Sequence, residues 1–306
     1  MEYDKEFIKP EWRSEYYVDE TMKKVWWVQM TILQDWGKWC DDHHLRWFVY
    51  GGALIGAIRH HGFVPWDDDI DVCMPREDYN KMLELWKTEG LKEPYFLQTT
   101  LTDEDCYQFW TSIRRSDTTG NRISLMNKRC HNGIAIDVMP FDGCENNLLL
   151  YRIRRFPLKV VSTICNTYVN EFNMSRSARI LRKIVRLFKI DYRKAYIWLE
   201  KKNSKHTWDK YDQVTLTLVA NPDVKSISER VWKKEDFDHA VYVDFEHIKI
   251  PVPCGYDRIL KMQYHDYMKL PPVEKRKGKH EMIYEPDIPY KKYCSEHYGV
   301  TYADQE

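Results

Sequence analysis

The chain has 306 residues, of which 43% are hydrophobic and 14% aromatic, so it can build a packed core. Lys plus Arg and Asp plus Glu balance at 47 each, which argues against a general attraction to nucleic acid. No apolar run approaches the ~20 residues of a membrane span, and the charged first residues lack a secretory signal core, so we expect a cytoplasmic protein with reduced cysteines.

The hydrophobic pattern predicts alternating helices and strands up to about residue 145. In chain order, these elements are a helix within 16–44, a strand over 45–50, a short helix over 53–60, a strand over 70–74, a helix from Pro75 to about 88, and strands over 95–98, 106–115 and 133–139. From about 145 to 210 the pattern is mostly helical and basic. Strand-like alternation returns over 240–252, and a helix is predicted over 256–268.

Two acids near residue 70 give the first chemical signal. Asp69 and Asp71 stand two residues apart in a predicted strand, so both carboxylates would point to one face. Such a pair is costly unless a cation or a shared proton lies between the two groups, and Mg²⁺ suits these oxygen ligands. A solvated acidic turn is the alternative, but apolar residues on both sides indicate a buried strand. These residues are Val64, Pro65, Trp66, Ile70, Val72 and Met74.

A third acid and a pair of glycines extend this pattern. Asp137 is an isolated acid in an apolar strand, and a buried Asp is rare unless it is paired or metal-bound. Backbone donors or an Arg could also satisfy it. Gly51 and Gly52 lie between a predicted strand and a predicted helix, where glycines let the backbone and the helix N-terminus approach a phosphate. The sequence therefore predicts a site of three carboxylates beside a phosphate-binding turn.

The whole pattern resembles the nucleotidyltransferase superfamily and, more specifically, the LicD family. The resemblance rests on the glycine pair, on the Pro-Trp-Asp-Asp-Asp-Ile-Asp run over 65–71, and on a second acidic block over 136–143. The closing segment over 252–280 is also similar, although His265 stands where the family pattern has glycine. The LicD family includes bacterial phosphocholine transferases and is related to fukutin and the fukutin-related protein.

The resemblance implies an α/β fold with a nucleotidyltransferase-type mixed sheet flanked by helices. We place a soft boundary near residue 145. Residues 1–145 would then form the catalytic core with its N-terminal helix. Residues 146–306 would form a mostly helical, basic region whose C-terminal strands pack back on the core.

The implied activity is Mg²⁺-dependent transfer of a phospho-alcohol group, typically phosphocholine from CDP-choline, with release of CMP. The acceptor would be a sugar hydroxyl of a glycan or lipid-linked oligosaccharide, such as a lipopolysaccharide or teichoic acid precursor. Phosphoryl transfer needs positioning and charge neutralisation more than covalent help from the protein. In this interpretation Asp69, Asp71 and Asp137 bind Mg²⁺ or Mn²⁺, and Asp137 is either a ligand or the base toward the acceptor hydroxyl.

Further residues around these acids receive roles from the same interpretation. Phosphate contacts are assigned to Gly51, Gly52, Arg59 and His280. Arg59 and His280 could instead be surface residues. Asp67 and Asp68 would tune the acid pair or bind a second ion, and Trp66 would either contact a quaternary ammonium through its ring or anchor the loop.

The segment over 152–189 carries ten Lys or Arg against one acid, Glu171. Within it, residues 176–189 have the pattern of a basic amphipathic helix. One hypothesis is that this helix contacts an anionic membrane surface, such as the inner face of the membrane, where a lipid-linked acceptor resides. The alternative is a solvated helix face over the core.

Three other functions fit part of the pattern. A true nucleotidyltransferase would use the same three acids to move NMP from an NTP to a small molecule or protein. A DxD glycosyltransferase would explain Asp69 and Asp71 but neither the glycine spacing nor Asp137. A non-catalytic nucleotide-binding module is a third possibility, although acids kept in an apolar strand are costly without a function.

Overall fold

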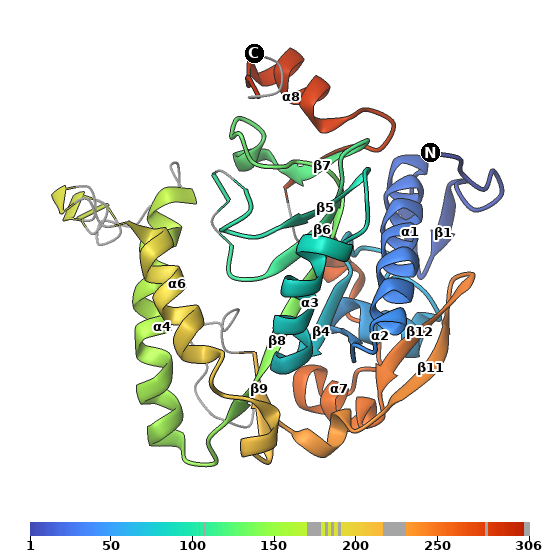
Figure 1. Cartoon of the computed structure of the whole chain (residues 1–306). Helices are drawn as coiled ribbons and strands as arrows, with labels where there is room; N and C mark the ends of the chain where they lie inside the picture. Colours follow the sequence, from blue (N-terminus) through green and yellow to red (C-terminus); the bar gives the residue numbers. More distant parts are fainter. Residues whose placement is uncertain are drawn as a thin grey trace.

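The computed structural model describes residues 1–103, 105–106, 108–169, 179–180, 183–184, 187–188, 191–216, 231–278 and 281–302. Over these residues the chain has a mixed α/β fold, in which helices flank a mixed sheet, as predicted (Figure 1). None of the described helices combines the length and the apolar character that crossing a bilayer requires.

The part of the chain up to residue 144 builds most of the main sheet. Its elements are β1 (Glu11–Arg13), β2 (Tyr16–Val18), α1 (Glu20–Asp42), β3 (Phe48–Tyr50), α2 (Gly51–His60), β4 (Asp71–Pro75), α3 (Arg76–Glu89), β5 (Tyr95–Gln98), β6 (Thr111–Arg115), β7 (Thr119–Arg122) and β8 (Ala135–Cys144). The Asp19 side chain caps α1 by accepting a hydrogen bond from the Met22 amide at 2.8 Å.

Several predicted boundaries are wrong, each for a local reason. The predicted strand over 106–115 is reduced to β6, because a side chain holds the preceding segment: the Thr100 hydroxyl donates to the Gln108 carbonyl at 2.6 Å. The predicted helix over 53–60 begins earlier, at Gly51, so both glycines belong to its first turn. The predicted helix over 256–268 ends at Tyr264, because His265 takes a positive φ of 58°.

The central strand of the sheet is β8. Its first half lies between β4, to which it is parallel, and β6, to which it is antiparallel. β3 extends the sheet beyond β4, and β5 extends it beyond β6, both in antiparallel pairs. The last three residues of β8 leave this arrangement and pair with β9 (Gln213–Thr215), which pairs in turn with β10 (Val231–Lys233).

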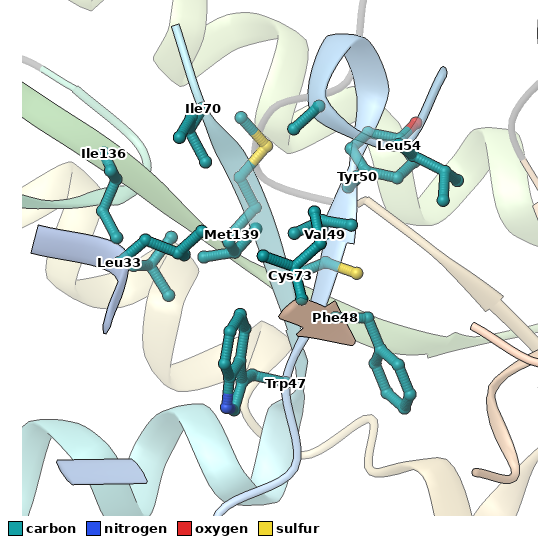
Figure 2. Close-up of a cluster of buried hydrophobic side chains, with 14 of the residues drawn as sticks. Leu33, Trp47, Phe48, Val49, Tyr50, Leu54, Ile70, Cys73, Ile136 and Met139 are labelled. Atoms are coloured by element: carbon teal, nitrogen blue, oxygen red, sulfur yellow. The ribbon is translucent and has the colours of Figure 1, made fainter. Parts of the chain in front are cut away.

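Apolar side chains cover both faces of β3 and β4 (Figure 2). Val72, Cys73 and Met74 of β4 are almost completely buried, which explains a near-continuous apolar run in place of polar–apolar alternation. α1 and α3 pack against the sheet, and Leu33 of α1 reaches this cluster (Figure 2). The strand that directly follows the acidic run is therefore fixed in place by its packing in the core.

The rest of the chain adds helices and short two-stranded sheets around this core. α4 (Leu148–Val169) and α6 (Tyr192–Asn203) pack against each other beside the sheet (Figure 1). The other elements are β11 (Ala240–Phe245), β12 (Ile248–Pro253), α7 (Tyr256–Tyr264), β13 (Met282–Glu285) and α8 (Tyr290–Tyr298). The β11–β12 hairpin contacts α2 and β3, and β13 pairs with β7. The predicted boundary near 145 falls between β8 and α4, and the division into two regions stays a prediction.

Candidate active site

Three neighbouring strands place polar side chains in one row. Asp71, the first residue of β4, is the register partner of Asp137 in β8, and Asp137 is the register partner of Ser112 in β6. Register partners on adjacent strands point to the same face of a sheet. The Ser112 hydroxyl donates to Asp137 Oδ1 at 2.5 Å, which confirms that these two side chains meet. The sheet therefore brings together two of the three predicted carboxylates.

Asp69 lies outside the strand, contrary to the expectation that it and Asp71 share one. The β4 ladder begins at Asp71 because its partner β3 ends opposite, at Tyr50, where the chain turns into α2. Ile70 already lies beside β8, since its carbonyl accepts a hydrogen bond from the Asp137 amide at 2.9 Å. Asp69 thus lies in the loop, two residues before β4 begins.

The glycine pair packs directly against two of the acids. A Cβ on Gly52 would lie 1.9 Å from Asp67 Oδ2, and a Cβ on Gly51 would lie 3.1 Å from Asp71 Oδ2. Gly51 also has a φ of +59°, which other residues rarely adopt. Both carboxylates therefore sit at the N-terminus of α2, where the helix dipole favours negative charge. The predicted strand–glycine–helix turn is present, and its glycines make room for acids.

Residues distant in sequence anchor the acidic loop by its backbone. The Trp26 indole donates to the Asp67 carbonyl at 3.1 Å, and the Gln29 amide donates to the Asp68 carbonyl at 2.8 Å. The Tyr284 hydroxyl lies 3.2 Å from both the carbonyl and Oδ2 of Asp68. Sequence reasoning missed these three anchors, because nothing local marks a residue of α1 or β13 as a partner of this loop.

The loop carries a donor set for a hard cation. Asp67, Asp68 and Asp69 each offer a carboxylate oxygen within 4.8 Å of the others. In the part of the chain that the structure describes, they form the one group of at least three potential ligands with this spacing. Carboxylate oxygens are the ligands that Mg²⁺ and related ions prefer. This group therefore fits a divalent cation. Of the three predicted ligands it contains only Asp69, while Asp71 and Asp137 lie on the adjoining strands β4 and β8.

Burial sets the acid–base properties of two groups here. Desolvation raises the pKa of Asp137, and the Ser112 hydrogen bond and the Arg114 charge oppose this shift. Desolvation and the nearby Asp68 carboxylate raise the pKa of Tyr284 well above its usual range, which keeps its hydroxyl protonated as a donor. A carboxyl with a raised pKa is suited to accept a proton near neutral pH.

Arg59 and Trp66 contact residues outside the acidic run. Arg59 Nη1 donates to the Tyr267 carbonyl at 2.8 Å, and its Nε donates to His60 Nε2 at 2.9 Å. The Trp66 ring is buried. The centroid of the His60 ring, which meets it edge-on, lies 6.1 Å from the Trp66 centroid, and Cζ of Arg276 lies 5.9 Å from the same centroid. These contacts favour the alternative in which Trp66 anchors the loop. The phosphate contact assigned to Arg59 stays a prediction.

Two predicted features lie partly or wholly outside the described residues. His280 is one of them, so its assigned phosphate contact has no structural test. Of the basic segment 176–189, the structure describes 179–180, 183–184 and 187–188, and all six residues are exposed.

Comparisons with known proteins agree with this geometry. The family model described as "LicD/FKTN/FKRP, nucleotidyltransferase domain" matches residues 44–152, a range that runs from just before β3 into α4 and contains every predicted site residue except His280. The lipopolysaccharide cholinephosphotransferase LicD of Haemophilus influenzae is 30% identical over 271 residues, which cover 85% of this chain and 96% of that protein.

Two uncharacterised proteins match shorter stretches. One, from Rickettsia typhi, is 24% identical over 119 residues, 36% of this chain and 38% of its own length. The other, from Rickettsia prowazekii, is 31% identical over 77 residues, 23% of this chain and 29% of its own length.

Proposed function

The chain belongs to the LicD family, and from this membership we propose that it is a phosphotransferase that moves phosphocholine from CDP-choline to a sugar hydroxyl of a cell-surface glycan precursor. The Haemophilus relative, which matches almost from end to end, is named for cholinephosphate transfer to lipopolysaccharide. The observation that carries the proposal is the register pairing of Asp71 with Asp137 beside the acidic loop. Such a concentration of carboxylates suits a site that handles phosphates through a cation.

In this proposal Asp69 and Asp71 hold Mg²⁺, for which Mn²⁺ could substitute, and Asp137 is either a further ligand or the base toward the acceptor hydroxyl. The closeness of the Asp67, Asp68 and Asp69 carboxylates supports a hard cation at this place. When bound, the cation would neutralise negative charge on the phosphates of the donor. Asp67 and Asp68 would supply further oxygen ligands or balance the local charge.

The chain's own residues position the donor and move the proton. The phosphate contact assigned to Gly51 and Gly52 would lie beside the Asp67 and Asp71 carboxylates, at the N-terminus of α2, so a phosphate oxygen would bind there together with the cation. The acceptor hydroxyl oxygen would form a new bond to the phosphorus of phosphocholine while the bond to CMP breaks. If Asp137 is the base and not a ligand, it would take the proton from that hydroxyl, since its pKa is raised and Ser112 fixes its orientation.

Transfer of a nucleotide is the second candidate, because the matching family model is described as a nucleotidyltransferase domain. The two reactions differ in which product carries the nucleotide. Phosphocholine transfer leaves free CMP, whereas nucleotidyl transfer from an NTP leaves pyrophosphate and a nucleotidylated acceptor.

A donor panel separates these reactions. The purified protein would be incubated with a lipopolysaccharide acceptor and, in turn, CDP-choline, CDP-ethanolamine, CDP-ribitol and the four NTPs. We expect CMP and a phosphocholine-labelled glycan from CDP-choline. Release of CMP from another CDP-alcohol alone would correct the transferred group. Pyrophosphate from an NTP, with nucleotide on the acceptor, would replace the proposal with nucleotidyl transfer.

A further inference from the structure

Helix α4 turns an apolar stripe toward solvent. Leu149, Ile153, Phe156 and Val160 are 65%, 60%, 67% and 43% exposed. Their spacing of four, three and four residues puts them on one face of the helix. Residues on the opposite side of the helix, such as Tyr151, pack inward. The face that points away from the core, where polar residues are expected, is therefore the apolar one.

The stripe is part of a wider concentration of exposed apolar side chains. Half of the large apolar side chains that are exposed on the described residues lie between 149 and 198. Besides the stripe, these are Leu150, Ile180, Ile184, Leu187, Phe188, Ile197 and Trp198. On α4, where the helical spacing puts four of these side chains on one face, the concentration forms an exposed apolar patch, and such patches mark places of contact.

The charge on α4 has one sign. No Asp or Glu occurs within Leu148–Val169, whereas Arg152 is exposed next to the stripe. Arg179 and Lys183, which are also exposed, alternate with exposed isoleucines in the described part of 179–188. Apolar side chains interleaved with cationic ones are the composition of helices that lie in the interface of an anionic bilayer.

We propose that α4 docks the protein onto an anionic lipid surface, with its apolar stripe inserted among the lipids and the exposed cations Arg152, Arg179 and Lys183 facing the lipid headgroups. Charge complementarity favours a membrane over a second copy of the chain, because pairing this face with itself would bring like charges together. The contact would be interfacial, since the described helices contain no candidate membrane span. The proposal does not depend on which group the active site transfers.

Flotation of the full-length protein with vesicles tests this surface. Vesicles of phosphatidylcholine alone would be compared with vesicles that also contain phosphatidylglycerol, at low and high salt. We expect the wild type to float with the anionic vesicles and to be released by salt. The double variant Ile153→Ser/Phe156→Ser should bind at least about tenfold more weakly, because it lacks two large apolar side chains that the wild type transfers from water into the bilayer.

Matched variants keep the test decisive. Trp12→Ser changes an exposed apolar residue of β1, on the opposite side of the molecule from α4 (Figure 1), and should float like the wild type. Arg152→Gln/Lys183→Gln should lose most of the salt-sensitive binding. All the changed residues are exposed, so the melting temperature should stay the same.

Three results would overturn the proposal. One is a wild type that does not float with anionic vesicles at low salt. Another is an Ile153→Ser/Phe156→Ser variant that binds as well as the wild type. The third is light scattering that shows a wild-type dimer and a monomeric double variant, because the stripe would then be covered by a second copy.

Discussion

Gly52 leaves the space that the Asp67 carboxylate occupies. A Cβ at this position would lie 1.9 Å from Asp67 Oδ2, and Asp67 is itself buried. We therefore expect Gly52→Ala to displace this carboxylate and to lower kcat/KM for the donor by about tenfold or more, because the site depends on exact positioning.

Gly278→Ala is the control for this substitution, because nothing lies within 4 Å of its would-be Cβ. Steady-state kinetics should give a clearly lower kcat/KM for Gly52→Ala than for Gly278→Ala. A Gly52→Ala enzyme as active as Gly278→Ala would show that the position of Asp67 does not matter to the reaction.

His60 makes the stability of the fold depend on pH. Burial and the adjacent Arg59 lower its pKa from 6.5 to about 4, and its Nε2 accepts a hydrogen bond from Arg59, which requires the neutral ring. Between pH 6.5 and 4 the unfolded chain binds more protons at this residue than the folded chain does. This contribution to stability is therefore present above pH 6.5 and is lost as the pH falls toward 4.

We expect the wild type to lose on the order of 1 kcal/mol more stability than His60→Gln between pH 7 and 4.5, since glutamine accepts a hydrogen bond but does not titrate. Urea unfolding at several pH values measures this difference. His297→Gln, at an exposed position of α8, should follow the wild type. Parallel pH profiles for wild type and His60→Gln would rule out this source of pH dependence.

The sequence indicates the individual acids of the site better than it indicates their neighbours. Asp71 and Asp137 stand out because each is an acid within an apolar strand, and the structure pairs these two strands in register. Ser112 and Tyr284 give no such signal, because a Ser in a strand and a Tyr in a distant strand have many ordinary roles. Their contacts with Asp137 and Asp68 depend on strand pairing across long stretches of chain.

The helices and strands were also predictable where the signal is local and not where it depends on a distant partner. The long amphipathic helix α1 and the apolar strands β4 and β8 were predictable in type, because their patterns repeat over many residues. β7 was missed, since its four residues Thr119–Arg122 are polar and pair only with β13, which comes much later in the chain. Local pattern carries no information about such a partner.

The end of helix α7 carries backbone strain that its sequence hints at. His265, where the family resemblance leads us to expect glycine, has φ 58° and ψ −110°, a conformation that is costly for a residue with a side chain. We expect His265→Gly to stabilise the protein by about 1 kcal/mol. The strain energy that is relieved in the folded state is larger than the entropic cost of the more flexible glycine in the unfolded state.

Thermal unfolding would measure the effect of His265→Gly. The contrasting variant is His43→Gly at the end of α1, where φ is −96° and glycine relieves nothing. It should be neutral or destabilising. A lower melting temperature for His265→Gly would mean that the histidine side chain makes contacts worth more than the strain.

At the scale of the whole molecule, a buried ion network ties the helical region to the sheet. The Arg76 guanidinium of α3 contacts Asp142 of β8 and Glu200 of α6, and Arg76 and Asp142 are completely buried. Burial raises the pKa of Glu200, and the Arg76 charge opposes that shift. The network crosses the predicted boundary near residue 145, so α6 should not unfold independently of the core.

Removing the Arg76 guanidinium would take from Asp142 and Glu200 the cation that both contact, and would leave the buried Asp142 with only the longer pair to Arg154 at 3.9 Å. We expect Arg76→Met to destabilise the protein by about 3–5 kcal/mol, and Arg76→Met/Asp142→Asn to recover part of that loss. Urea unfolding followed by circular dichroism gives both values. Equal stabilities of Arg76→Met and the wild type would show that the network contributes nothing.

The central claim is that the carboxylates around Asp71 catalyse phosphocholine transfer with a divalent cation. Its most direct test is CMP release from CDP-choline by the wild type, by Asp71→Asn and by Asp244→Asn, whose carboxylate is exposed on β11. We predict Mg²⁺-dependent release by the wild type and Asp244→Asn, abolished by EDTA, and a rate at least about a hundredfold lower for Asp71→Asn at an unchanged melting temperature. Wild-type rates in Asp71→Asn, or release that persists in EDTA, would contradict the claim.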